Sequence, residues 1–177
     1  MARVLVVYAT TEGQTAKIAE HIADAGRAAG HEVLVRRADD VEDAELSGFE
    51  AFVVGASLHA GRYQREARTF VERNVELLGA RPSAFFSVSL AAASRNADER
   101  EDVERLIARF LEDTHWTPKL TGSFAGALKY TRYGWLKRAL MRRIARKEGG
   151  DVDSSRDFEY TDWAQVTRFS ERFFGAL

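Results

Sequence analysis

Short apolar runs alternate with longer amphipathic stretches along the whole chain. The apolar runs are rich in Val and Phe and predict five strands, at 4–8, 32–37, 51–55, 84–88 and 120–127. Between them, apolar residues recur at helical spacing and predict helices from 15 to about 30, at 64–78, at 98–111 and after Asp162. The run at 51–55 is apolar without interruption, which is typical of a strand covered on both faces.

The order of these elements predicts the fold class. Strands that alternate with helices are joined by crossovers, which favours a parallel sheet with helices on both faces. We therefore expect a single α/β domain, residues 1–177, with a doubly wound five-stranded sheet. More than 30 residues after the start of the fifth strand, 126–160, exceed what a minimal five-strand fold needs, and we interpret them as a functional insertion.

Composition excludes several classes of protein. The chain has no cysteine, so disulfides, thiolate metal sites and thiol nucleophiles are ruled out. No apolar stretch reaches 18 residues, and the first apolar run is too short for a signal peptide, so we expect a soluble chain or one attached to a membrane surface. Acids and histidines are scattered, which predicts no metal site and gives no support to a hydrolase.

Charge is distributed unevenly, although the net charge is only −1. Eight cations and no acid lie between 129 and 147, which leaves 18 cations and 27 acids, a net charge of −9, in the rest of the chain. In a helical projection of 133–147, apolar residues take one side and arginines the other. Such a helix can lie in a membrane interface, or it can complete the protein's own core with its arginines solvated. The acidic remainder disfavours nucleic acid as a partner.

The turn after the first strand, Thr-Thr-Glu-Gly-Gln-Thr at 10–15, predicts a phosphate site. In a parallel sheet, ligands bind beyond the carboxyl ends of the strands, where a helix N-terminus holds a phosphate without a cation. The turn matches neither the Walker A pattern nor GxGxxG, which disfavours ATP hydrolysis and Rossmann-type NAD binding. The alternative is an ordinary helix cap. The expected phosphate ligands are Thr10, Thr11, Gly13, Gln14 and Thr15.

Two further strand ends, 55–63 and 87–94, are rich in small residues that let the backbone approach a flat ligand. Together with the first turn, they would hold a phosphate and a ring system at one edge of the sheet. The expected ring contacts are Ser57, Leu58, His59 and Gly61 from one segment, and Ser87, Val88, Ser89, Leu90 and Ala91 from the other.

The sequence resembles the flavodoxin-like family and, more narrowly, the menaquinone-dependent protoporphyrinogen IX dehydrogenases of haem biosynthesis. The resemblance rests on 10–15, Gly-Ala-Ser at 55–57 with Gly61 and Tyr63, Pro-Ser-Ala-Phe-Phe-Ser-Val at 82–88, Gly-Ala-Leu-Lys-Tyr at 126–130, Arg-Tyr-Gly-Trp at 132–135, Gly-Gly at 149–150 and Tyr-Thr-Asp-Trp at 160–163. It implies FMN as cofactor, protoporphyrinogen IX as six-electron donor and a membrane quinone, menaquinone or ubiquinone, as acceptor. It also implies a cytoplasmic protein that is peripheral on the inner face of the cell membrane.

Two other functions remain open at this stage, a flavodoxin-like FMN electron carrier and a general quinone reductase without porphyrinogen activity. The segment 87–94 has no Tyr, Trp or Asp to cover a flavin, which makes the carrier the weaker interpretation. The residue types predict no definite catalytic acid or base, and His59 is the one weak candidate. Weaker expectations are substrate propionate binding by Arg62, Lys129 and Arg132, and membrane contact by Trp135, Arg138, Arg142, Arg143 and Arg146.

Overall fold

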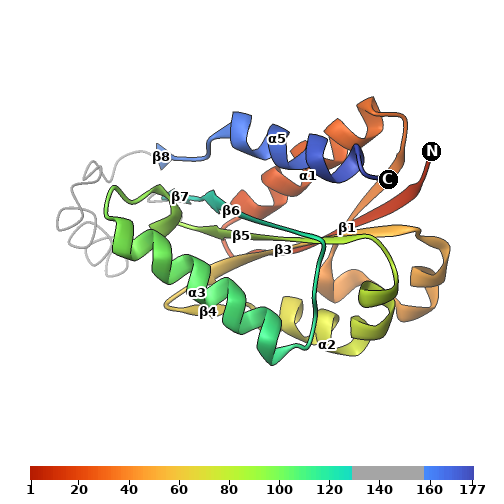
Figure 1. Ribbon diagram of the computed structural model, residues 1–177, viewed down its shortest axis with the longest axis horizontal. Helices are drawn as coiled ribbons and strands as arrows, with labels where there is room; N and C mark the ends of the chain where they lie inside the picture. The colour runs from red at the N-terminus through yellow and green to blue at the C-terminus, as the bar shows by residue number, and fades with distance from the viewer. Residues whose placement is uncertain (129–157) are drawn as a thin grey trace.

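The computed structural model describes residues 1–128 and 158–177 (Figure 1). Its main elements are β1 (Arg3–Ala9), α1 (Gln14–Ala28), β2 (Glu32–Arg37), β3 (Ala51–His59), α2 (Arg65–Ala80), β5 (Ser83–Ser89), α3 (Ala97–Asp113), β6 (Leu120–Ala125) and α5 (Trp163–Phe174). Short strands β4 (Arg62–Tyr63), β7 (Ala127–Leu128) and β8 (Phe158–Glu159) and 3-10 turns at Ala38–Asp40, Asp43–Gly48 and Ala91–Ala93 complete it.

The sheet confirms the predicted α/β class. Its five long strands are all parallel and lie in the order β2-β1-β3-β5-β6, with β4 pairing antiparallel to the end of β3. Helices α1 and α5 cover one face, and α2 and α3 cover the other (Figure 1). The strand order reverses between β1 and β3, and such a switch point is where doubly wound sheets bind ligands.

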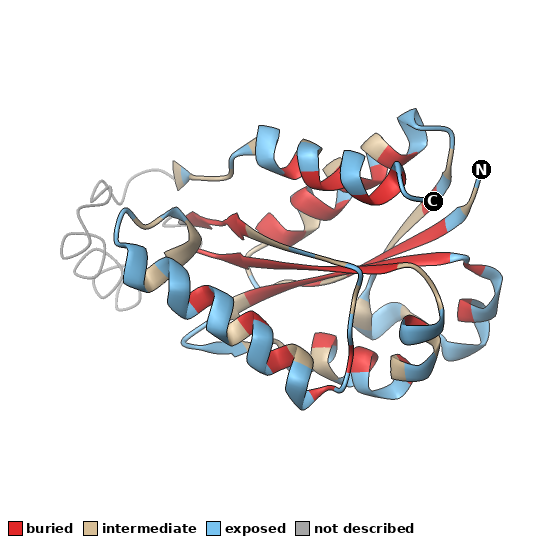
Figure 2. Cartoon of the chain, in the orientation of Figure 1, coloured by how far each residue is buried: buried red, intermediate tan, exposed pale blue. Residues whose placement is uncertain are grey.

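Alternate residues of each central strand enter two separate cores. Val4 and Val6 of β1 pack with α1 and α5, whereas Leu5 and Val7 pack with α2 and α3. Both faces of the sheet are therefore covered, and its central strands are buried along their length (Figure 2). This double burial explains why the strands read as continuous apolar runs.

Two strand boundaries differ from the sequence-based prediction. The third strand does not end at Gly55 but continues to His59 and turns back through β4, with positive φ at Ala60 (48°) and Gly61 (74°). The fifth strand ends at Ala125, short of the predicted 127. There the Gly126 N–H still bonds to Ser89 (3.0 Å), but its carbonyl accepts from Tyr160 N–H (3.1 Å), so the chain leaves the main sheet and β7 pairs with β8.

The amphipathic helix expected at 133–147 lies outside the described residues, as do Lys129, Arg132, Trp135, Arg138, Arg142, Arg143 and Arg146. In the two described ranges, no helix combines the length and apolar character needed to cross a bilayer.

Candidate cofactor site

The loop between β1 and α1 lies at the carboxyl edge of the sheet. Gly13 precedes the helix with φ 92°, a left-handed conformation that glycine adopts at little cost. Its N–H donates to the Thr10 hydroxyl (3.0 Å), which closes the turn from within. The first backbone N–H groups of α1, beginning at Gln14, have no acceptor inside the helix and form the positive end of its dipole.

Three buried side-chain atoms in the described part of the chain have no hydrogen-bond partner, and all belong to this region. They are Gln14 Oε1, Thr15 Oγ1 and Gln64 Oε1. The Gln14 and Thr15 side chains are themselves buried, with 4% and 0% exposure. Because an unsatisfied buried polar atom is costly, a cluster of three in one place indicates a ligand that supplies the missing hydrogen bonds.

Gln64 connects the loop to the neighbouring strand and was not among the predicted site residues. Its amide nitrogen donates to the Thr11 hydroxyl (3.4 Å) and to the Ser57 hydroxyl. It occupies the position immediately before α2, where a polar residue is unremarkable in sequence. Its role depends on the β3–β4 hairpin, which returns the chain to the loop.

The β3–β4 hairpin brings the first group of predicted ring contacts to the same edge. Ser57 is buried, Leu58 is half-buried, and His59, Gly61 and Arg62 are exposed. Exposure leaves His59 accessible to a ligand or to solvent, and its proposed part in proton exchange stays a prediction.

The second group of predicted ring contacts, from Ser87 to Ala91, lies at the end of β5 and in the turn that follows it. Its first two residues are buried. Ser87 is completely buried and its hydroxyl accepts from the Tyr63 hydroxyl (2.9 Å), while Val88 is also buried. Burial raises the pKa of Tyr63 to about 12, although the hydrogen bond to Ser87 acts in the opposite direction. The side chains of Ser87 and Val88 are therefore buried at the carboxyl edge of the sheet and do not reach its surface.

The remaining residues of that group lie at the turn that follows β5. Ser89 is buried and its hydroxyl accepts from Ala92 N–H (3.1 Å), whereas Ala91 is half-buried. Leu90 is 36% exposed, and apart from the terminal Met1 and Leu177 no large apolar side chain in the described residues is as exposed. Leu90 and Ala91 are thus the members of this group that can touch a ring.

The segment that follows the insertion also contacts the start of α1, next to the β1–α1 loop. The Gln14 amide donates to Thr161 (2.9 Å), and Lys17 pairs with Glu159 of β8 (3.0 Å). Desolvation raises the pKa of Glu159, but hydrogen bonds from Lys17, Gln14 and Trp163 outweigh it and hold the pKa below its usual value. Of these residues only Gln14 was predicted to belong to the site, although the Tyr-Thr-Asp-Trp motif at 160–163 was a signal in the sequence for the segment that contains Thr161.

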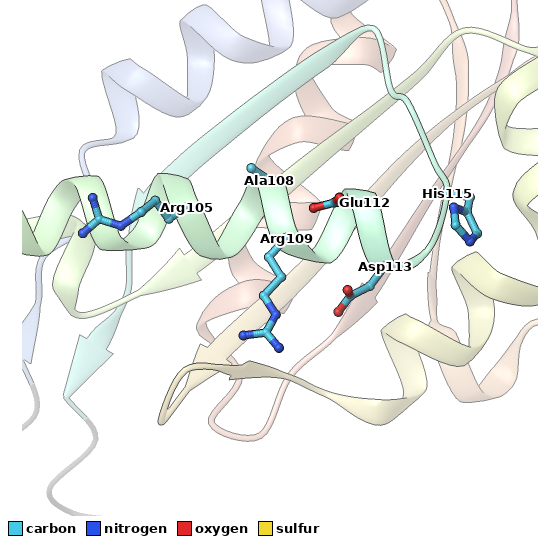
Figure 3. A pocket seen from close by; sticks show the side chains of 6 residues that line it. All are labelled: Arg105, Ala108, Arg109, Glu112, Asp113 and His115. Atoms are coloured by element: carbon cyan, nitrogen blue, oxygen red, sulfur yellow. The ribbon is translucent and has the colours of Figure 1, made fainter.

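Away from this edge, a hollow lies on the outer surface of α3, and its lining residues include Arg105, Arg109, Glu112 and His115 (Figure 3). Its Asp113 pairs with Arg68 (3.3 Å), and none of its side chains is among the unpartnered buried atoms. The described residues hold no group of three or more potential metal ligands. The carboxyl edge of the sheet is therefore the site that the structure favours.

The strand order and the hydroxyl-rich loop at the switch point define a doubly wound nucleotide-binding protein of the flavodoxin-like fold. A family model described as the flavodoxin domain matches residues 5–155. The chain therefore belongs to the flavodoxin domain family.

Two curated relatives extend over nearly the whole chain. Protoporphyrinogen IX dehydrogenase [quinone] of Escherichia coli (strain K12) is 33% identical over 95% of this chain and 92% of that protein. The protein with the same name from Leishmania major is 38% identical over 96% of this chain and 73% of that protein. The resemblance stated from the sequence is thereby confirmed.

Solved structures show the same fold at low sequence identity. A short-chain flavodoxin associated with a non-canonical PDU bacterial microcompartment superposes with a TM-score of 0.63 at 13% identity, covering 99% of both chains. Oxidised flavodoxin 1 from Bacillus cereus gives 0.60 at 15% identity, again over 99% of each.

FMN is the cofactor of this family, and the site fits it. A phosphate can accept from the free N–H groups of α1 and from the Thr15 hydroxyl, whose oxygen otherwise lacks a partner. Gln14 Oε1 and Gln64 Oε1 are acceptors, which suits the hydroxyl and N–H donors elsewhere in FMN. The predicted cofactor is thus supported by three atoms that the protein leaves unsatisfied.

Proposed function

We propose that this chain oxidises protoporphyrinogen IX to protoporphyrin IX with FMN as cofactor and a quinone as electron acceptor. The observation that carries the proposal is the identity of 33–38% over about 95% of the chain to two proteins of that name. The cluster of unpartnered atoms at the carboxyl edge supports it, because a flavin enzyme needs a site there.

Bound FMN supplies the redox chemistry, and the protein positions the reactants. Thr10, Thr11, Gly13, Gln14 and Thr15 hold the phosphate end through hydroxyls and main-chain N–H groups. Leu58, His59 and Gly61 of the hairpin and Leu90 and Ala91 after β5 flank the ring.

The overall reaction must remove six hydrogens from the porphyrinogen. Three quinones, each accepting two electrons and two protons, balance that loss, so the site works in three successive two-electron rounds. An open approach to the ring is required in every round. The small alanines at 91–93 and the absence of Tyr or Trp in 87–94 support such an approach, because no aromatic side chain of this segment can stack over the ring.

A direct assay separates this function from that of an electron carrier. The FMN-loaded protein is mixed anaerobically with protoporphyrinogen IX and a soluble quinone, and protoporphyrin fluorescence is followed with time. We expect the rate of fluorescence increase to be proportional to the amount of enzyme and, when quinone is limiting, the increase to stop after one protoporphyrin has formed for every three quinones supplied. Reduction of FMN by the porphyrinogen without turnover by any quinone would instead favour the carrier.

The acceptor is further proposed to be a membrane quinone, reached from the cytoplasmic face by a peripherally bound protein. The eight cations between 129 and 147 support this, since each cation near an anionic surface contributes about 1 kcal/mol of attraction. Propionate binding by Arg62, Lys129 and Arg132 belongs to the same proposal.

Membrane attachment is tested by replacing Arg142, Arg143 and Arg146 with glutamate. We expect sedimentation with vesicles containing anionic lipid to fall at least tenfold, because three attractive charges become repulsive. The control makes the same change of charge at the exposed Arg36, Arg109 and Arg172 and should sediment like the wild type. If both variants lose vesicle binding equally, the loss follows from net charge alone and contradicts a specific membrane contact by Arg142, Arg143 and Arg146.

A further inference from the structure

The motif Tyr-Thr-Asp-Trp at 160–163 contains a threonine that joins three separate parts of the fold. Thr161 follows β8, and its hydroxyl donates to the carbonyl of Ala125 at the end of β6 (2.7 Å). The same hydroxyl bonds to the side-chain amide of Gln14, the first residue of α1 (2.9 Å). Nothing in the proposed reaction so far requires this bridge.

The proton count of the bridge determines which way the Gln14 amide points. A threonine hydroxyl has one hydrogen, and Thr161 gives it to Ala125. It can therefore only accept from Gln14, so the atom of Gln14 that it contacts must be the amide nitrogen. The orientation of a glutamine amide is often ambiguous, but here the hydrogen-bond chain leaves a single solution.

Gln14 also acts on Glu159 by contributing to the lowered pKa of this carboxylate, which pairs with Lys17 (3.0 Å). The hydrogen bond to Thr161 directs the Gln14 amide nitrogen toward the end of the insertion. The end of the side chain that remains is Oε1, an acceptor that is buried and has no partner in the described residues.

A lone acceptor cannot serve a phosphate dianion, because the dianion has no hydrogen to donate. The sugar-alcohol chain of a flavin nucleotide does carry hydroxyl donors, and these match Gln14 Oε1. We propose that Thr161 is a positioning residue for the cofactor: it sets the Gln14 amide so that its oxygen binds a hydroxyl of the flavin's polyol chain, and not its phosphate. This inference rests on the proposed FMN site and deepens it.

The test compares FMN with riboflavin, which has the polyol chain but no phosphate. Dissociation constants of both flavins are measured by fluorescence quenching at pH 8, where a phosphate monoester is a dianion, with wild type, Thr161→Val and Thr161→Ser. We expect Thr161→Val to raise the dissociation constants of both flavins about tenfold, because the Gln14 amide is no longer held in position and one hydrogen bond to the polyol chain is lost in each complex. Thr161→Ser retains the hydroxyl and should bind both like the wild type.

Two further variants keep the test decisive. Gln14→Leu removes the acceptor itself, and adding Thr161→Val to it should cause no further loss if both act through one hydrogen bond. Thr15→Val should weaken the binding of FMN and leave the binding of riboflavin unchanged, because riboflavin has no phosphate. Near-ultraviolet circular dichroism of each apoprotein verifies that it is folded.

Unequal effects would overturn the proposal. If Thr161→Val weakens the binding of FMN but not of riboflavin, the bridge acts on the phosphate. If it weakens the binding of neither flavin, the bridge has only a structural role. The assay contains no porphyrinogen and no quinone, so its outcome is separate from that of the proposed reaction. Wild-type flavin binding without dehydrogenase turnover would contradict the function and leave the role of Thr161 intact.

Discussion

Thr15→Val is expected to weaken FMN binding by roughly 10- to 100-fold, the range that one hydrogen bond to a charged group accounts for. Thr15 is completely buried, and its hydroxyl has no partner in the described part of the chain. Valine has nearly the same shape but cannot donate to a phosphate. The apoprotein should gain up to about 1 kcal/mol in free energy of unfolding, because a buried unsatisfied hydroxyl is removed.

The opposite signs of these two effects distinguish a ligand contact from a structural one. Thr114 is a buried threonine whose hydroxyl already donates to Phe110 (2.8 Å), so Thr114→Val should lose about 1 kcal/mol of stability and retain FMN affinity. Fluorescence titration and urea unfolding of both apoproteins supply the measurements. Unchanged FMN affinity in Thr15→Val would remove that hydroxyl from the phosphate site.

Gly55→Ala is expected to destabilise the fold by about 3 kcal/mol, the upper part of the usual range for overpacking a core. Gly55 of β3 pairs in register with Phe86 of β5, whose ring lies across the glycine. An added Cβ would come within 1.9 Å of the Phe86 ring, and Phe86 is completely buried and cannot move aside freely.

A second glycine provides the matched control. Gly79 lies in α2, and a Cβ there would meet no atom within 4 Å, so Gly79→Ala should be neutral or should stabilise by about 0.5–1 kcal/mol. Urea unfolding of the two variants gives the comparison directly. A loss of less than about 1 kcal/mol in Gly55→Ala would mean that Phe86 repacks more easily than its burial indicates.

The hydroxyl-rich turn at 10–15, which we propose binds phosphate, could be recognised in the sequence because its signal is local. A hydroxyl-rich turn between a buried strand and a helix can be read within six residues, and the structure brings Thr10, Gly13 and Thr15 together there. The last helix was equally readable, since Asp162 precedes it and caps it by accepting from Ala164 (3.0 Å) and Gln165 (3.2 Å).

The positions of the two segments that we propose contact the ring could be predicted in part. Small residues at 55–63 and 87–94 correctly indicated two strand ends at one edge of the sheet, but composition could not distinguish the exposed residues of these segments from the buried ones. Ser87 is buried and accepts a hydrogen bond from Tyr63, whereas Leu90 is exposed. That difference depends on where β5 ends and on β4, which returns the chain toward β3.

The sequence by itself determined the alternation of strands and helices, the hydroxyl-rich turn and the concentration of cations between 129 and 147, because each is a property of neighbouring residues. The tertiary structure alone decided that Gln64 joins Thr11 to Ser57 and that Thr161 joins Gln14 to Ala125. Those contacts link residues up to 147 positions apart in the chain. Their hydrogen bonds exist only once the parallel sheet has brought the ends of its strands to one edge.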